Sequence, residues 1–268
     1  MIKRKGLSTV FIVIVLIWLL VPLLVSLIYS LFENWAGIVP KGFTLQAYAS
    51  VLTDPQFGKA LLDTVLICIV PILLTNVIVL LALFVVTAYF PRLEKYVQII
   101  CMVPYTVQGV ILSVSILSLY VGGKGFFASR VVMLTGAYCI IILPYVYQGI
   151  RNSMRSVNMP MLLDAAQMLG CSRIEAFFKV VVPNIMSGII VSSLLAVGII
   201  FGDYVLLRNL AGSTVTNLQM YLYQVMKADS RKSSATFILI MLVMFLITTV
   251  VLVLKAKNDK GQKERWHG

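Results

Sequence analysis

Six long apolar runs constrain the fold of this chain more than any other feature of its sequence. They cover about residues 7–31, 60–90, 96–120, 129–150, 185–207 and 233–254. Each is long enough to cross the hydrocarbon core of a bilayer as a helix, which takes about 20 residues. Because 60% of the 268 residues are hydrophobic, no soluble core could bury so much apolar surface. The sequence therefore predicts an all-α polytopic membrane protein with six transmembrane helices.

The first apolar run could also be a secretory signal peptide, because Lys3, Arg4 and Lys5 precede it. It is far longer than the roughly 7–15 residues of a signal-peptide core, and no small-residue cleavage site follows it. We therefore expect an uncleaved first transmembrane helix. The polar and aromatic segment that follows is expected to be an exported loop with one short surface helix near residues 45–52.

The positive charges set the predicted orientation. Six spans place both termini on one side of the membrane. Most of the 22 Lys and Arg residues lie in the N-terminal tail, the turn at 91–95, the polar loop at 151–183 and the C-terminal tail. The positive-inside rule places these segments in the cytoplasm, although the opposite segment 208–232 also carries basic residues. We expect an N-terminal helix with its exported loop (1–57), a central helical domain (58–254) and a charged, disordered cytoplasmic tail (255–268).

The loop between the fourth and fifth runs carries closely spaced helix start and stop signals. Asn158 can cap a helix that has Pro160 in its first turn, and Gly170 can adopt the left-handed conformation that ends it. Ser172-Arg173-Ile174-Glu175 forms a capping box for a second helix, which Pro183 stops or kinks. The sequence thus predicts two short helices joined by a glycine elbow. On these signals alone, the loop could be an ordinary cytoplasmic hairpin.

This loop resembles the EAA loop of the membrane subunits of binding-protein-dependent ABC importers. The family pattern is Glu-Ala-Ala, three residues, Gly, nine residues, Ile, one residue and Leu-Pro. Its positions are occupied here by Asp164, Ala165, Ala166, Gly170, Val180, Val182 and Pro183. The spacing is kept throughout, and the replacements are chemically conservative.

Three further segments are similar to the spermidine/putrescine-type permeases and the related phosphonate and ferric-ion permeases. They are residues 43–48 (Phe-Thr-Leu-Gln-Ala-Tyr), 201–205 (Phe-Gly-Asp-Tyr-Val) and 218–223 (Leu-Gln-Met-Tyr-Leu-Tyr). Asp63-Thr64 departs from the family's Asn followed by Ser or Thr. The resemblance extends over about residues 58–254 and implies the type I ABC permease fold for that domain.

The resemblance implies a non-catalytic subunit that forms half of a translocation pathway for a small polar solute of the polyamine, phosphonate or ferric-ion class. A dimer of cytoplasmic P-loop ATPases would bind the ATP and dock on the polar loop, so the chain itself needs no cofactor. The docking residues it implies are Met161, Asp164, Ala165, Ala166, Leu169, Gly170 and Pro183. A second permease chain, with a paralogue favoured over a second copy, and an extracytoplasmic binding protein would complete the importer in a bacterial cytoplasmic membrane. The alternative is a channel-like or scaffold membrane protein whose loop docks a cytoplasmic partner.

Charged residues are scarce inside the apolar runs, which makes Asp203 a candidate for the solute pathway, together with its neighbour Tyr204. An intramembrane carboxylate costs ~2.5–3.5 kcal/mol on insertion scales, so it calls for an explanation. Asp203 could attract a cation, or it could be a structural partner of Arg208 or of a tyrosine hydroxyl. Residues 104–109 also share Pro, Tyr, Gln and Gly with residues 144–149. The match could be a coincidence of two kinked helices, which is the interpretation we favour, or both segments could contribute to a shared polar path. The second interpretation adds Tyr105 and Gln108 to the pathway candidates.

Several other classes of protein are excluded. The only histidine is His267, so no Ser/His hydrolase or His-ligated metal site can form. The four cysteines include no Cys-x-x-Cys pair, and no P-loop motif is present. One intramembrane carboxylate cannot form a protease dyad, and an ion-coupled transporter usually has several intramembrane ionisable residues. Basic runs interleaved with aromatic residues, as nucleic-acid binding needs, do not occur. If transport is active, its energy must come from a partner.

Overall fold

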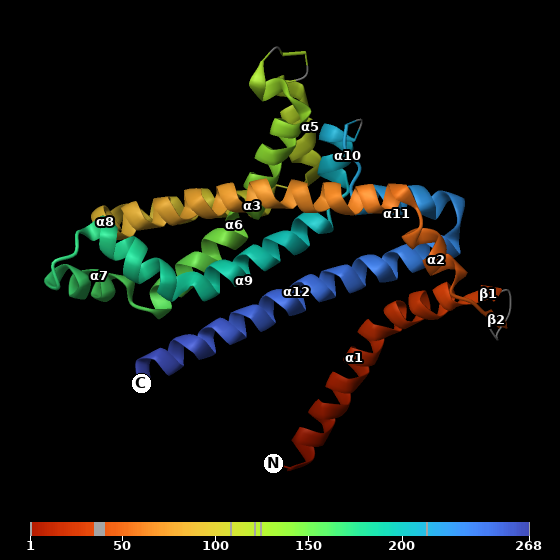
Figure 1. Ribbon diagram of the computed structural model, residues 1–268, viewed down its shortest axis with the longest axis horizontal. Helices are drawn as coiled ribbons and strands as arrows, with labels where there is room; N and C mark the ends of the chain where they lie inside the picture. Colours follow the sequence, from red (N-terminus) through yellow and green to blue (C-terminus); the bar gives the residue numbers. More distant parts are fainter. Residues whose placement is uncertain are drawn as a thin grey trace. The chain divides into compact units, whose positions relative to one another are not determined.

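The computed structural model is almost wholly helical, as the apolar runs predict (Figure 1). It describes residues 2–34, 41–107, 109–120, 122–123, 125–212 and 214–267. Its α-helices are α1 (Ile2–Leu31), α2 (Gln46–Leu52), α3 (Pro55–Tyr89), α4 (Glu94–Met102), α5 (Gly109–Tyr120), α6 (Arg130–Ser156), α7 (Met159–Met168), α8 (Arg173–Ala176), α9 (Val182–Phe201), α10 (Val205–Ala211), α11 (Leu218–Ala228) and α12 (Ser230–His267). The 3-10 segments are η1 (Pro91–Leu93), η2 (Val103–Thr106) and η3 (Phe126–Ala128), and η4 (Phe177–Val181) is a π-helix.

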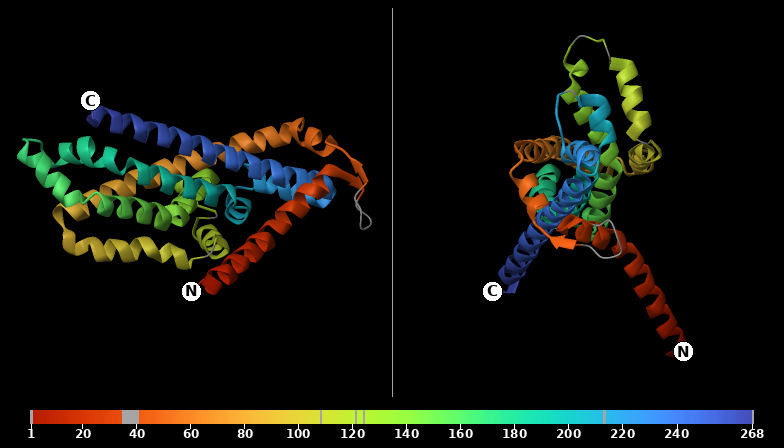
Figure 2. Two further views of the ribbon diagram at one scale, coloured as in Figure 1. Left: turned by 90° about the horizontal axis from the view of Figure 1, so that it is seen from below. Right: turned by 90° about the vertical axis from the view of Figure 1, so that its right-hand side faces the viewer.

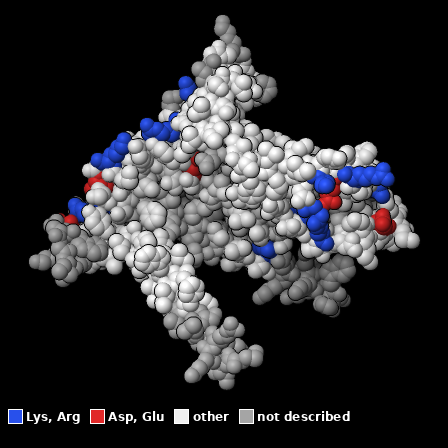
Figure 3. All heavy atoms as spheres, turned by 180° about the vertical axis from the view of Figure 1, so that it is seen from behind, with Lys and Arg blue, Asp and Glu red and all other residues white. Residues whose placement is uncertain are grey.

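Five helical stretches in the described part of the chain are long and apolar enough to cross a membrane. They are Phe11–Leu31, Pro55–Tyr89, Arg130–Ser156, Arg173–Phe201 and Ser230–Val253. On the face drawn in Figure 3, most side chains are neither acidic nor basic, as contact with lipid requires.

The predicted third span is not one continuous helix. The segments Pro91–Thr106 and Gly109–Tyr120 meet at a bend of 99°, and the count reaches six spans only if this bent pair is one broken span. Val107, between them, has an extended backbone. Pro104 cannot donate a helical hydrogen bond and Gly109 has a low helix propensity, so both weaken a continuous helix at this point. The prediction of a single helix over 96–120 is therefore wrong.

The predicted disordered tail also differs from the structure. The helix α12 continues without a break through residues 255–267. The tail is rich in Lys, Glu and Gln, which are good helix formers, and extending an existing helix needs no new nucleus.

The chain divides into two compact units, residues 1–59 with 220–246 and residues 60–219 with 247–268. In the first unit the predicted surface helix is present as α2. An unpredicted antiparallel pair of short strands, β1 (Phe32–Asn34) and β2 (Lys41–Phe43), precedes it, with Phe32 opposite Phe43.

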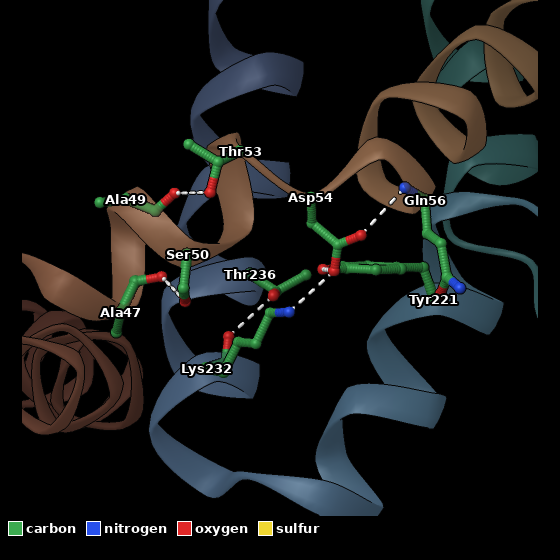
Figure 4. A network of polar contacts seen from close by, with 9 residues as sticks. All are labelled: Ala47, Ala49, Ser50, Thr53, Asp54, Gln56, Tyr221, Lys232 and Thr236. Carbon is green, nitrogen blue, oxygen red and sulfur yellow. Dashed lines mark hydrogen bonds and ion pairs between the residues drawn. The ribbon is translucent and has the colours of Figure 1, made fainter.

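A polar network around Asp54 joins the start of α3 to α11 and α12 within this first unit (Figure 4). The Asp54 carboxylate accepts hydrogen bonds from the Tyr221 hydroxyl and the Lys232 ammonium, both at 2.8 Å. The hydrogen bond from Lys232 holds the pKa of the Asp54 carboxyl below its usual value. The network therefore contributes its full stabilisation above the ordinary pKa of a carboxyl. This stabilisation is lost as the pH falls from that value through the lowered pKa of Asp54.

In the second unit, α6 and α9 lie side by side (Figures 1 and 2). Small residues spaced four apart allow this approach, namely Gly149 and Ser153 on α6 and Gly188 and Ser192 on α9. A Cβ atom on Gly188 would lie 2.6 Å from the Ser153 Cβ, closer than two carbons can pack. Such pairs of small residues are a common way for membrane helices to pack closely. The two helices that enter and leave the polar loop are therefore held against each other.

Candidate functional site

The loop between α6 and α9 contains the predicted elbow between α7 and α8 (Figure 1). Local hydrogen bonds close the turn at this elbow. Gly170 follows α7 with a φ of 87°. Its N–H donates to the Gln167 carbonyl at 2.9 Å, and the Cys171 N–H donates to the Ala166 carbonyl at 3.2 Å. These two bonds are the Schellman pattern of a helix end, which needs a residue that tolerates a left-handed backbone. The prediction for Gly170 is confirmed.

The predicted capping box at the start of α8 is also confirmed. The Ser172 side chain accepts a hydrogen bond from the Glu175 N–H at 3.2 Å. The Glu175 carboxylate interacts in turn with the Ser172 backbone and with the Lys179 ammonium. The Ser172 side chain thus satisfies the backbone of Glu175, and the Glu175 side chain satisfies the backbone of Ser172. This reciprocal pair defines where α8 begins.

Asn158 does not cap α7 with its side chain as expected. It occupies the N-cap position with a left-handed backbone, at φ 50° and ψ 62°, and makes no side-chain capping bond. A capping side chain needs an extended backbone, whereas the tight turn out of α6 imposes a left-handed one that Asn tolerates. Pro160 lies in the first turn of α7, as predicted.

Pro183 does not end the second helix. Arg173–Phe201 is one helical stretch of 29 residues, in which α8 passes through the π-turn η4 into α9. The prediction of a second short helix is therefore wrong. A wider π-turn just before Pro183 accommodates the missing N–H and the ring that would disturb a regular α-helix. The start of this helix is therefore continuous with the fifth span.

One face of α7 packs against the chain itself. Met159, Leu163 and Ala166 are buried at helical spacing, and Ala166 is only 5% exposed. The expectation that Ala166 lies on a docking surface is therefore not met, because its side chain is already covered by this chain.

The opposite face of α7 is open and largely apolar. Met161 is 68% exposed, Met168 is 90% exposed and Leu169 is 87% exposed. Asp164, Ala165, Gly170 and Pro183 are exposed as well. Met161, Ala165 and Met168 follow one another at the four- and three-residue spacing of a single helix face. We call Met161, Asp164, Ala165, Met168 and Leu169 the outer face of α7. The resemblance did not imply Met168, although its seven-residue spacing from Met161 indicates the same face.

Asp203 binds the start of α10 rather than standing alone in a span. Its carboxylate accepts hydrogen bonds from the backbone N–H groups of Leu206 at 3.3 Å and Leu207 at 3.2 Å. The buried Tyr138 hydroxyl donates to the same carboxylate at 3.0 Å. Of the two structural partners considered, the tyrosine hydroxyl is therefore correct. The Arg208 guanidinium donates to the hydroxyl of the neighbouring Tyr204.

The two Pro-Tyr segments that resemble each other in the sequence meet in the structure. The rings of Tyr105, in η2, and Tyr145, in α6, have centroids 4.9 Å apart and an edge-to-face arrangement. Tyr105 is 46% exposed and lies directly before the bend between η2 and α5. Gln108 lies outside the described residues. Two tyrosine rings, each with a polar hydroxyl, therefore lie together beside the bend between η2 and α5.

Comparisons with known proteins agree with these features. The family described as binding-protein-dependent transport system inner membrane component matches residues 92–263, which include the whole polar loop. A curated relative, the spermidine/putrescine transport system permease protein PotC of Haemophilus influenzae, is 23% identical over 252 residues, covering 93% of this chain and 96% of the relative.

Two solved structures share the fold. One is a bacterial ABC transporter involved in the import of the acidic polysaccharide alginate, with a TM-score of 0.69, 18% identity, and coverage of 96% of this chain and 97% of that chain. The other is a bacterial alginate ABC transporter in complex with an alginate pentasaccharide-bound periplasmic protein, with a TM-score of 0.70, 17% identity, and coverage of 94% and 93%.

Proposed function

Because this chain belongs to the family of binding-protein-dependent transport system inner membrane components, we propose that it forms half of the translocation pathway of an ABC importer for a small polar solute. It is a multi-pass inner-membrane permease of that family, not a catalytic subunit. The energy for import would come from a separate ATPase, because the chain has no P-loop motif.

The observation that carries this proposal is the outer face of α7. An exposed row of Met, Ala and Leu side chains on a polar loop suits contact with another protein, since Met adapts to varied partners and Ala allows close approach. The elbow at Gly170 presents this row at a fixed angle to α8. A cytoplasmic P-loop ATPase is the partner that we propose for it.

The route from the ATPase to the spans would be mechanical. When two ATPase subunits close on ATP, each would carry one docked α7 toward the other. Since α8 runs continuously into α9, and α9 packs closely on α6, a displacement of α7 would tilt both helices. The spans would then alternate between inward-open and outward-open arrangements.

A polyamine-like cation is the cargo class that we favour, with phosphonate and ferric-ion solutes as the alternatives. The similarity to a permease named for spermidine and putrescine supports it. The exposed ring of Tyr105 beside Tyr145 supports it as well, because aromatic faces attract organic cations. Tyr204, Gln108 and Asp203 stay pathway candidates, although the Asp203 carboxylate also binds the start of α10.

The complete importer would contain three further kinds of component. They are a P-loop ATPase dimer, a second permease chain, with a paralogue favoured over a second copy, and an extracytoplasmic substrate-binding protein. Both termini of this chain would lie in the cytoplasm, where the positive-inside rule places the loop that contains α7.

Purification of the tagged chain from its native membrane in mild detergent tests the proposal. We expect a P-loop ATPase to copurify at about one copy per permease chain. After reconstitution with the binding protein, import of labelled spermidine or putrescine should require ATP. Recovery of the chain without an ATPase, together with solute flux that ignores ATP, would favour the channel-like or scaffold alternative.

A further inference from the structure

Arginines from both sides of α7 bind the end of α3 and the short turn that follows it, residues 90–94. The turn contains η1 and ends at Glu94. One set of arginines lies at the end of α6, before α7, and the other arginine begins α8, directly after the elbow. All of these residues belong to the second unit.

The contact on the α6 side is a shared ion pair. The Glu94 carboxylate accepts hydrogen bonds from Arg151 Nε at 2.9 Å and from Arg155 Nη2 at 3.0 Å. Arg151 Nη2 forms an ion pair with the same carboxylate oxygen at 2.8 Å. Arg151 and Arg155 are one helical turn apart, so both guanidiniums reach the same carboxylate oxygen. Because Arg151 and Glu94 are partly buried, solvent screens this pair less than an exposed one.

The contact on the α8 side binds the end of α3. Arg173 Nη1 donates to the Ala88 carbonyl at 2.7 Å, and the guanidinium lies 5.4 Å from the centroid of the Tyr89 ring. Ala88 is among the last residues of α3, whose carbonyls have no helical N–H partner. A cation at this end also interacts favourably with the helix dipole. The rings of Phe84 and Phe177, 4.3 Å apart, add an apolar contact between α3 and η4.

Apolar packing does not fill the space between these contacts. A cavity of about 210 Å³ lies among the ends of α3 and α6 and the starts of α4 and α7, and Glu94, Arg151 and Arg155 line it. Across this cavity, the polar contacts join the segments directly before and after α7 to the start of α4 and the end of α3. A displacement of α7 that carries the end of α6 and the start of α8 with it would therefore also pull on α3 and α4.

We propose that Glu94 and Arg173 are positioning residues that transmit the displacement of α7 to α3 and α4; this rests on the proposed function. Through them, α3 and α4 move together with α6 and α9 when the partner ATPase displaces the loop. Without them, the ATPase still docks on the outer face of α7 and hydrolyses ATP, but part of the membrane domain no longer follows.

The test uses the complete transporter in proteoliposomes, with Glu94→Gln and Arg173→Gln variants of this chain. We expect the ATPase to copurify and to hydrolyse ATP in both variants. The amount of solute imported per ATP should fall by about fivefold or more, the lower end of the range that is common for coupling between sites. Lys179→Gln is the matched control, because it removes a cation from an exposed ion pair within a single helix of the same loop. It should import at the wild-type ratio.

A charge exchange separates transmission from a simple loss of folding. Glu94→Arg combined with Arg151→Glu re-forms the pair in reverse, and we expect it to recover most of the imported solute per ATP. The inference is overturned if Glu94→Gln and Arg173→Gln import at the wild-type ratio, or if import and hydrolysis fall by the same factor. Loss of the ATPase from these variants, or failure of the charge exchange to recover coupling, also overturns it. A wild-type complex without any ATPase would instead overturn the proposed function, and the inference with it.

Discussion

At the scale of single residues, Asp203 is a capping group for α10. Two backbone N–H groups at the start of that helix and one buried tyrosine hydroxyl bind its carboxylate. Near the other end of α10, Arg130 donates to the Leu210 carbonyl, and Asn209 binds Ser113 on α5. The short helix is thus fixed at both ends by side chains, and Asp203 has a structural task whatever its part in transport.

The first prediction concerns the coupling between Asp203 and Tyr138. Asp203→Ala removes a cap and leaves a buried hydroxyl without its acceptor, so it should destabilise the protein by about 1–3 kcal/mol. Combined with Tyr138→Phe, the loss should be smaller than the sum of the two single losses, because both changes remove the same hydrogen bond. Thermal unfolding of the purified permease measures this cycle.

Arg208 provides the control for that cycle. Its guanidinium binds Tyr204 rather than Asp203, so Arg208→Gln combined with Asp203→Ala should give additive losses. Additive losses with Tyr138→Phe and non-additive losses with Arg208→Gln would show that the assignment of partners is wrong.

At the scale of elements, the elbow at Gly170 sets the direction of α7. A Cβ atom on Gly170 would meet no other atom within 4 Å, so a substitution there acts through the backbone alone. Gly170→Val should insert normally but import much less solute per ATP, because a β-branched residue disfavours the left-handed conformation and the elbow would change its angle. Import and ATP hydrolysis are measured in the same proteoliposomes.

Gly198→Val is the matched control for the elbow. A Cβ atom on Gly198 also meets nothing within 4 Å, and this glycine lies within α9 without a left-handed backbone. The Gly198→Val variant should import as much solute per ATP hydrolysed as the wild type. If Gly170→Val does so too, the elbow does not determine how α7 engages its partner.

The end of α7 and the start of α8 were predictable because their signals are local. The glycine elbow and the Ser172–Glu175 box each act within a few residues of the chain. The course of the helix through Pro183 was not predictable, since it depends on the π-turn at 177–181 and on the packing of the buried Phe177 against Phe84. The same holds for the inward face of α7, because burial of Ala166 depends on neighbours distant in the sequence.

At the scale of the whole molecule, the number of apolar runs and the spacing of the loop motif indicated the family correctly. Each of these signals is contained in a continuous segment of the sequence and needs no knowledge of distant contacts. Contacts across long separations were missed, such as the pair of Glu94 with Arg151, 57 residues apart. A single charged residue in a short turn carries no signal of its partner. Sequence patterns therefore predicted most of the spans and the elbow of the polar loop, but not the contacts of this loop with α3 and α4.

The central claim is that a P-loop ATPase binds the outer face of α7. A photo-crosslinking amino acid placed at Met161 or Met168 in the producing bacterium tests it most directly, with the buried Leu163 as the control position. We expect covalent adducts with a P-loop ATPase, identified by mass spectrometry, from Met161 and Met168, and crosslinks only within this chain from Leu163. Adducts from Met161 and Met168 that contain lipid or unrelated proteins but no ATPase would contradict the claim.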